Sequence, residues 1–302
     1  MVFLALQSLG TYPVIQECAE FMKNKGKWRT CIAVTALLLV GTVKMVGHIR
    51  KQMRRKKWNN AGKDVAVLHM FRRGYFSPNL SPFVMKLEMY LRMARIPYQI
   101  DHEESLGPKG KSPWITLNGE EIADSQIIMD RLGLEYGKEF SAHLSLEEKA
   151  VAQAMRIMVE EHLLWCYAYW QYIHDDMKDV KKVVKVPAIW LPFMPLFKGY
   201  VKRAMKMQGM GRHTHQEIEE MGRKDLAVLS IWLENKPYFM GDKPTEVDCA
   251  IFGALAQIQW NSPGSPYLKM IESDFSNLSA YCFRIKEKFW PDWNKCLDLH
   301  QA

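Results

Sequence analysis

The sequence lacks the short signatures of several protein classes. Its six cysteines form no CxxC pair, and no zinc-finger spacing, RNA-binding signature or internal repeat occurs. In the body of the chain no basic stripe is interleaved with aromatic residues, so the net charge of +8 does not indicate a nucleic-acid partner. Scattered cysteines are typical of reduced, structural thiols in a protein that faces the cytosol. We therefore expect neither a metal site nor nucleic-acid binding.

Long hydrophobic runs are also scarce, and the most prominent one lies at residues 31–46, CIAVTALLLVGTVKMV. It is apolar except for Lys44, whose long side chain can reach an interface. The run is close to the lower limit of roughly 17 residues for a spanning helix. The following segment, HIRKQMRRKKW, is more basic than the preceding one, so the positive-inside rule places the main body in the cytosol.

Two other interpretations of this run compete with a membrane anchor. A cleaved signal peptide requires small residues after the run, whereas basic residues follow it here. A buried helix of a soluble core does not require dense charge on both sides. We predict a tail over residues 1–61 that contains a single-pass anchor at about 30–47. Its short length and basic flanks suit the mitochondrial outer membrane or the endoplasmic reticulum.

Residues 65–132 form the stretch around which the rest is organised. A buried strand is predicted at 65–71, a loop at 72–80 and a helix at about 81–95, with Lys86 and Glu88 off its apolar stripe. Ser81 is a good N-cap, and Pro82 suits the first helical position. One interpretation is that Ser81 only caps the helix. The other is that its hydroxyl and the helix N-terminus together stabilise an anion such as a thiolate.

Further elements follow this helix. A second strand begins at residues 97–100, and Asn118-Gly119 predicts a hairpin over 114–122. A helix starts at Asp124-Ser125, and from about residue 145 every predicted element is helical, with capping boxes at Ser145, Thr214 and Thr245. Three prolines exclude one regular helix over 183–197. This apolar segment is a loop over the core, a lid over a pocket, or a second membrane contact.

Together these elements resemble the glutathione transferase fold. The resemblance implies an α/β, thioredoxin-like domain at residues 62–140 and an all-helical domain at 141–302, preceded by the transmembrane helix. The family-like positions are the catalytic-residue motif Ser81-Pro82-Phe83, the cis-proline turn Ser112-Pro113, the γ-glutamyl-binding pair Asp124-Ser125, and the buried capping motif Thr245-x-x-Asp248.

A closer resemblance covers nearly the whole chain. The sequence is similar to the failed axon connections family, whose members are membrane-anchored relatives of glutathione transferases and metaxins. The blocks that carry it are LSPFVMKLEMYLRMARIPYQ, GKSPWI, VEEHLLWCYAYW, GMGRH, GALAQIQW followed by SPG, and FW-P-x-W. This family implies a link to axon development and leaves enzyme activity open.

A set of site residues follows from the resemblance and from the chemistry of the side chains. Ser81 would donate a hydrogen bond to the thiolate of glutathione, the co-substrate. The loop at 72–80 is long for the family, so Tyr75 or Ser77 could replace Ser81 as donor, or the loop could fill the pocket. The loops that should flank the site carry Arg72, Arg73, Lys109 and Lys111, whose side chains either hold the carboxylates of glutathione or are simply solvated. Apolar substrate would contact Trp165, Tyr169 and Trp190, which at helical spacing are also ordinary core positions. A serine at position 81 excludes thiol redox chemistry there.

Two functions follow from these residues. The first is a glutathione transferase acting on apolar or lipid-derived electrophiles delivered from the bilayer. The second is a non-catalytic adaptor that uses its surface for partners, including a second copy of the chain. A binder that sequesters a small molecule without chemistry is a third interpretation.

Overall fold

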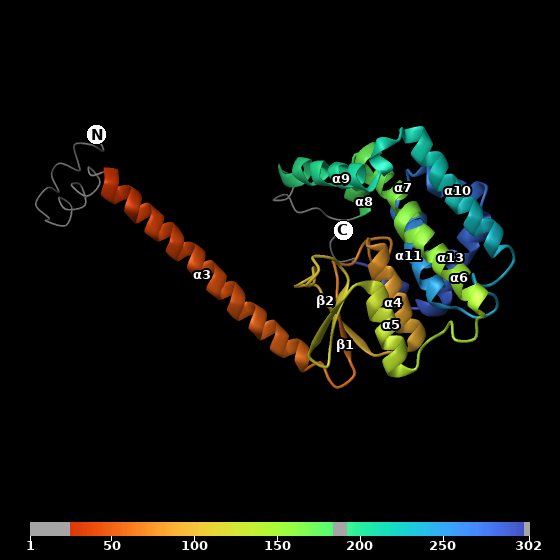
Figure 1. The fold of residues 1–302 in the computed structure, drawn as a ribbon, viewed down its shortest axis with the longest axis horizontal. Coiled ribbons are helices and arrows are strands. Elements are labelled where there is room, and N and C mark those ends of the chain that lie inside the picture. Colours follow the sequence, from red (N-terminus) through yellow and green to blue (C-terminus); the bar gives the residue numbers. More distant parts are fainter. Residues whose placement is uncertain (1–24, 184–191, 299–302) are drawn as a thin grey trace, which may run out of the picture. The chain divides into compact units, whose positions relative to one another are not determined.

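The computed structural model describes residues 25–183 and 192–298, and it divides into two units, residues 1–60 and 61–302. In the first unit, helix α3 (Lys25–Asn59) contains the predicted anchor and continues through the basic segment (Figure 1). From Ile32 to Asn59 it is long and apolar enough to cross a membrane. Its apolar side chains are exposed, with Leu37 and Leu38 at 71% and 67%.

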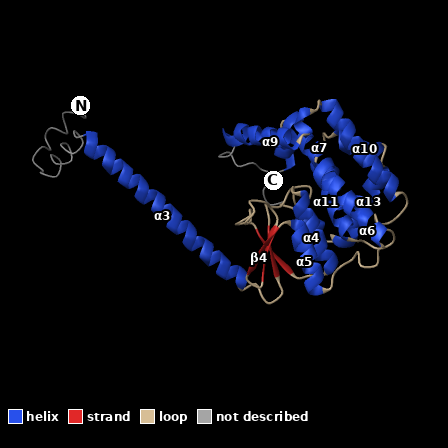
Figure 2. Cartoon of the chain, in the orientation of Figure 1, coloured by secondary structure: helices blue, strands red, loops and turns tan. Residues whose placement is uncertain are grey.

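The second unit begins with a four-stranded sheet in the order β2-β1-β3-β4 (Figure 2). Strand β1 (Ala66–His69) pairs in parallel with β2 (Tyr98–Asp101), and helix α4 (Pro82–Ala94) connects them. The hairpin of β3 (Trp114–Leu117) and β4 (Glu120–Ala123) adds antiparallel to β1. All residues of β1 and β3 are buried. This is the thioredoxin-like arrangement that the resemblance implied.

Local sequence explains where these elements turn and end. Asn118 and Gly119 both have positive φ, as the tight hairpin turn requires. Ser81 caps α4, which ends at Arg95 in the left-handed conformation. Helix α5 (Ser125–Tyr136) starts after Asp124 and ends at Gly137, again with positive φ.

The remainder is helical. The predicted helix that runs to His174 consists of α6 (Leu146–Met158), a π-helical turn η1 (Val159–Leu163), α7 (Leu164–Tyr169) and a second π-helical turn η2 (Trp170–His174). The helices after it are α8 (Lys178–Val183), α9 (Met194–Gln208), α10 (His215–Leu233), α11 (Glu246–Asn261), α12 (Pro266–Ser273) and α13 (Ser276–Phe289), with short 3₁₀ turns η4 (Met210–Arg212) and η5 (Trp293–Cys296). All three predicted capping boxes are present.

The predicted segment 183–197 is described only in part. Residues 184–191, and with them Trp190, lie outside the described residues. Pro195 falls in the first turn of α9, where a proline needs no hydrogen-bond partner.

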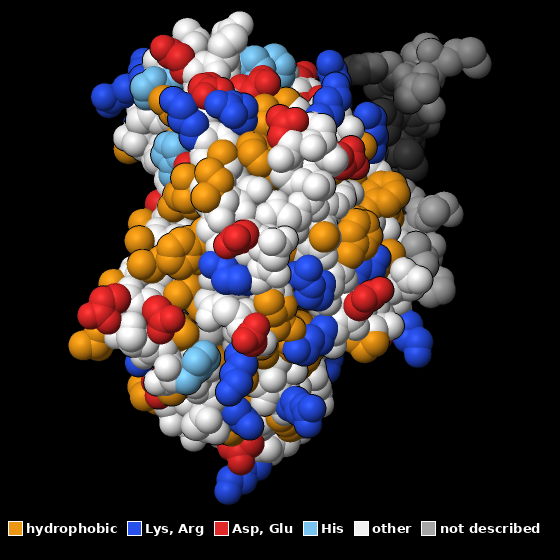
Figure 3. Space-filling model, turned by 90° about the vertical axis from the view of Figure 1, so that its right-hand side faces the viewer, with side chains coloured by type: hydrophobic (Ala, Val, Ile, Leu, Met, Phe, Trp, Pro, Cys, Tyr) orange, Lys and Arg blue, Asp and Glu red, His pale blue; other side chains and the backbone are white. Residues whose placement is uncertain are grey.

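Helix α11 is the centre of the body and packs against α4. Gly253 permits the close approach, because a Cβ there would collide with the carbonyl oxygen of Pro82 and lie 3.1 Å from the backbone nitrogen of Lys86. The helical domain is therefore fitted directly against the turn that carries Ser81. Seen on the face shown in Figure 3, the surface mixes acidic, basic and apolar side chains.

Candidate functional site

The register of the sheet brings the predicted site segments to one edge. His69 at the end of β1 pairs with Trp114 at the start of β3, and Trp114 pairs with Ala123 at the end of β4. The segments next to these residues are therefore neighbours at that edge: the loop that leads to Ser81, the turn at Pro113 and the start of α5. The Ser112–Pro113 peptide bond is cis.

Beneath this edge, the imidazole of His69 is fully buried and stacks on Trp114, with ring centroids 3.7 Å apart. Its two nitrogens lie 2.9 Å from a carboxylate oxygen of Asp101 and 2.9 Å from the hydroxyl of Thr116. Burial alone would raise the pKa of Asp101, but hydrogen bonds from His69 and the backbone outweigh it and lower that pKa. The cluster fixes the ends of three strands under the site.

Ser81 is half-buried at the N-terminus of α4. Its side-chain oxygen accepts a hydrogen bond from the backbone N–H of Val84 at 3.4 Å, and its own N–H donates to the side chain of Asn79. Among the described residues no acceptor is found for the Ser81 hydroxyl proton. Ser81 therefore caps its helix and still has a donor to offer a ligand, so the two interpretations from sequence are compatible.

The loop before Ser81 is held by the helical domain. Asn261 on α11 donates to the Ser77 hydroxyl at 2.7 Å, and that hydroxyl donates to the carbonyl of Asn79. Gln257 donates to the same carbonyl at 3.2 Å. Ser77 is fully buried and its hydroxyl is engaged, so Ser77 cannot serve as the alternate donor to a ligand. Tyr75 is half-buried and stays an alternate.

Two further short segments lie at this edge of the sheet, residues 124–125 and residues 111–112. Asp124 is exposed, and its carboxylate accepts from the backbone N–H groups of Gln126 and Ile127, while Ser125 is buried. The Ser112 hydroxyl oxygen is buried and finds no hydrogen-bond partner within the described part of the chain. Lys111 is exposed beside it. The edge thus offers a hydroxyl donor, an unsatisfied hydroxyl, a carboxylate and an ammonium group, which suit a small zwitterionic peptide.

Two charged residues expected off the apolar stripe of α4 are fully buried. The ammonium group of Lys86 contacts Glu160 at 2.5 Å and Gln126 at 2.8 Å, and the other oxygen of Glu160 contacts Arg156 at 2.6 Å. Burial lowers the pKa of Lys86 more than the neighbouring Glu160 raises it. This network ties the first turns of α4 and α5 to the helical domain.

Glu88 is the second buried charge. It accepts a bidentate pair of hydrogen bonds from Arg73 at 2.7 and 2.8 Å and one from the hydroxyl of Tyr98. The proposed role of Arg73 in holding a glutathione carboxylate is therefore wrong in this structure, because its guanidinium already serves Glu88. Helical periodicity predicts burial on one stripe only, whereas residues 84–91 of α4 are all buried, so the burial of Glu88 could not be predicted from the pattern.

Trp165 and Tyr169, predicted to line a substrate pocket, are half-buried against the helical core. Tyr169 faces the ring of His215 at 6.3 Å. A cavity of about 310 Å³ lies elsewhere, between α5, α6 and the start of α11, with Gln126, Arg156 and Glu246 in its wall. Because Gln126 follows Ser125, this cavity adjoins the start of α5.

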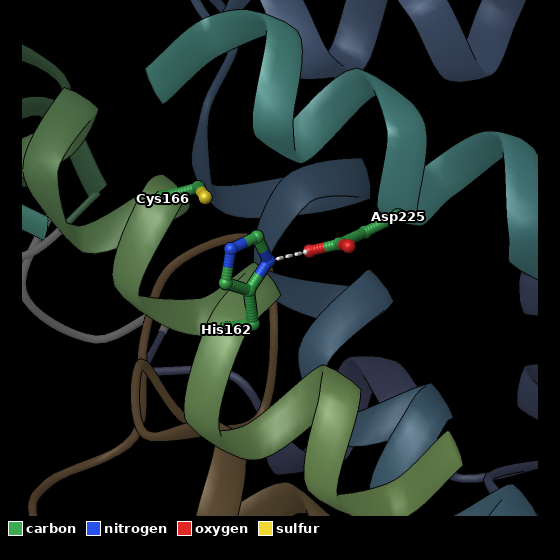
Figure 4. Close-up of side chains that lie close together, drawn as sticks. All are labelled: His162, Cys166 and Asp225. Atoms are coloured by element: carbon green, nitrogen blue, oxygen red, sulfur yellow. Dashed lines mark hydrogen bonds and ion pairs between the residues drawn. The ribbon is translucent and has the colours of Figure 1, made fainter. Parts of the chain in front are cut away.

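A second cluster joins His162, Cys166 and Asp225 (Figure 4). Their donor atoms lie within 4.8 Å of one another, with Nδ1 of His162 2.6 Å from Asp225. Ligands on one zinc ion, each about 2 Å from it, lie farther apart than this, so 2.6 Å is a hydrogen-bond distance. Burial raises the pKa of Cys166 to about 12, and its thiol contacts the sulfur of Met210. Cys166 therefore belongs to the core, and His162 and Asp225 form a hydrogen-bonded pair beside it.

Comparisons with known proteins agree with the observed fold. Sequence models of the glutathione S-transferase N-terminal domain and of the glutathione S-transferase C-terminal domain match residues 82–177 and 222–285. Among solved structures, beta-etherase LigF from Sphingobium sp. strain SYK-6 superposes with a TM-score of 0.53 at 15% identity, over 74% of this chain and 95% of that one. At that identity the likeness concerns the fold.

Curated relatives are closer in sequence. Failed axon connections from Drosophila melanogaster is 36% identical over 80% of this chain, which spans 62% of that relative. Isoprene-epoxide--glutathione S-transferase from Rhodococcus sp. (strain AD45) is 28% identical over 70% of this chain and 94% of the relative. Metaxin-2 from Mus musculus is 27% identical over 70% of this chain and 83% of the relative.

Proposed function

This chain belongs to the glutathione-transferase-like, metaxin-related family that includes Failed axon connections, and on that premise we propose that it is a membrane-anchored, glutathione-dependent transferase. Its substrates would be apolar or lipid-derived electrophiles. The observation that supports the proposal is the sheet register, which pairs His69 with Trp114 and Trp114 with Ala123, next to the segments that carry Ser81, Ser112-Pro113 and Asp124-Ser125.

In the proposed complex, glutathione lies along that edge. The Ser81 hydroxyl donates to the thiolate, and the N-terminus of α4 adds a favourable partial positive charge, so the thiol ionises near neutral pH. The backbone at Ser112 pairs with the cysteinyl part. The start of α5, with Asp124 and Ser125, receives the γ-glutamyl end, and Lys111 pairs with a carboxylate.

The reaction class is addition of the thiolate to an electrophilic carbon. The sulfur forms a bond to carbon as the carbon–oxygen bond of a strained ring, or the bond to a leaving group, breaks. The oxygen or leaving group then takes a proton from solvent. The Rhodococcus relative, whose name gives an isoprene epoxide as substrate, supports epoxides as one such class.

The proposed location is a membrane, with α3 as a single-pass anchor and the body in the cytosol. Supporting it are the length and apolar exposure of α3 and the basic residues that end it, including Lys56 and Lys57. The mitochondrial outer membrane and the endoplasmic reticulum are the two proposed sites.

A glutathione titration of the full chain in mild detergent tests the proposal. Saturating millimolar glutathione should raise the thermal midpoint, because a ligand at ten times its Kd stabilises the folded state by about 1.4 kcal/mol. Ser81→Ala should reduce this shift. Ser145→Ala is the matched control, because it removes the equivalent cap of α6, far from the site in sequence. This variant should keep the full glutathione-induced shift. Absence of binding in calorimetry at millimolar glutathione would refute the proposal.

The second candidate is a non-catalytic adaptor with protein partners. It is favoured by the loop at residues 72–80, which α11 holds through Asn261 and Gln257, so that part of the space before Ser81 is occupied by the chain itself. Turnover of an epoxide with glutathione that disappears in Ser81→Ala, with the fold intact, would rule out this candidate.

A further inference from the structure

Helix α9 lies outside both family-domain matches. The two family-domain matches cover residues 82–177 and 222–285, and α9 (Met194–Gln208) falls between them. It lies at one end of the helical domain, next to η2 and η4 (Figure 1). Neither the glutathione site nor the core explains its sequence, since Met205 is its single buried residue.

The outer side of α9 is apolar. Leu196, Tyr200 and Met207 are exposed at 71%, 71% and 74%. Spacings of four and seven residues place them in one stripe along the helix. Three large exposed side chains in one row are unusual on a helix that faces water alone.

The charge of α9 has one sign. Lys198, Lys202, Arg203 and Lys206 lie on it, and its sequence, MPLFKGYVKRAMKMQ, contains no acidic residue. Lys198 pairs with Asp176, whereas the other three make no ion pair with the described residues. At 100° per residue, Arg203 and Lys206 both lie on one side of the apolar stripe, and Lys202 lies farther around the helix on that same side. An apolar stripe beside unpaired cations is the pattern of a helix that lies in a membrane interface.

We propose that α9 docks onto the anionic surface of a lipid bilayer, with Leu196, Tyr200 and Met207 at the level of the headgroups and Lys202, Arg203 and Lys206 against lipid phosphates. Charge complementarity selects this occupant, because a purely basic helix repels a second copy of itself. The inference rests on the proposed anchoring by α3, which would keep α9 at a high effective concentration near the same membrane. Such docking would fix the orientation of the body on the bilayer that supplies its apolar substrates.

The test uses the full chain in lipid nanodiscs that carry one copy each, made from phosphatidylcholine alone or with phosphatidylserine. Hydrogen exchange of the backbone amides at residues 194–208 is measured by mass spectrometry. Co-migration of protein with discs reports insertion of α3, so failure of the anchor is recognised separately from failure of docking. Exchange over α9 should be at least tenfold slower in the anionic discs.

Two α9 variants and one control make the test specific. Each cation near an anionic surface contributes about fivefold to the docking equilibrium, so Lys202→Gln/Arg203→Gln/Lys206→Gln should abolish the slowing. Leu196→Ser/Tyr200→Ser/Met207→Ser should do the same. The control is Val228→Ser/Ile231→Ser on α10, where the side chains are 46% and 78% exposed, and it should retain the slowing.

Three results would overturn the proposal. The first is equal exchange in the two kinds of disc. The second is slowing that both α9 variants retain. The third is slowing that occurs only when discs carry two copies, which would assign the apolar stripe to contacts between copies of the chain.

Discussion

Replacing Glu160 with glutamine should strongly destabilise the body of this protein. Lys86 is 1% exposed, and its ammonium group relies on Glu160 for its only contact with an opposite charge among the described residues, at 2.5 Å. Gln126 contributes a neutral acceptor at 2.8 Å. A buried charge that loses its partner costs about 3–5 kcal/mol of unfolding free energy. We therefore expect Glu160→Gln to lower the free energy of unfolding by an amount in that range.

The reverse substitution should be far milder. Lys86→Met removes the buried charge, while Glu160 keeps Arg156 at 2.6 Å, so the expected loss is about 1 kcal/mol. In the double variant Lys86→Met/Glu160→Gln, the glutamine no longer faces an unpaired ammonium group. The loss of unfolding free energy should therefore be about 1–2 kcal/mol, less than that of Glu160→Gln alone. The two effects are therefore strongly non-additive.

Urea denaturation of the full chain in detergent, followed by tryptophan fluorescence, measures these values. Glu135→Gln is the control, because the side chains of Glu135 and its ion-pair partner Arg131 are each about 40% exposed. This pair should contribute less than about 1 kcal/mol to the free energy of unfolding. Burial lowers the pKa of Lys86. In Glu160→Gln the ammonium group should therefore lose its proton at a lower pH in the folded state than in the unfolded state, so the free energy of unfolding should rise as pH rises from 7 to 9. A loss below about 1 kcal/mol in Glu160→Gln, or additive effects, would refute the reasoning.

Three further predictions concern the helical domain. Gly253→Ala should lower stability by about 1–3 kcal/mol in urea denaturation, because the methyl group meets backbone of α4, whereas Gly199→Ala, with no atom within 4 Å, should not. Asp248→Asn should cost about 2–4 kcal/mol in the same assay, because the buried carboxylate accepts hydrogen bonds from Thr245, Tyr281 and the backbone; unchanged stability would contradict this. Burial and the stacked ring of His174 lower the pKa of His215, so the stability that neutral His215 contributes is lost as pH falls below about 6.5. Between pH 7.5 and 5.5 the thermal midpoint of His215→Gln should therefore decline less than that of the wild-type protein. An equal decline would argue against a lowered pKa at His215.

Local elements were predictable because their signals are local. Caps at Ser81 and Ser145, the Asn118-Gly119 turn and the apolar periodicity each act within a few residues, so they survive whatever packs around them. Helix α12 and the π-helical turns in the helix that runs to His174 were not predicted. A π-turn differs from an α-turn by one hydrogen-bond shift, which periodicity does not reveal.

The sequence by itself determined the βαβ-hairpin order, the helical second half and the candidate residues Ser81, Pro113 and Asp124. Only the tertiary structure decided which of their neighbours remain available to a ligand. It buried Ser77 against α11, committed Arg73 to Glu88, and enclosed Lys86 between two domains. Helical periodicity records one apolar stripe, whereas a helix packed on all sides must also bury its polar side. The partners that make this possible for α4 are distant in the chain: Glu160 lies 74 residues from Lys86, and Asp292 lies 200 residues from Arg92.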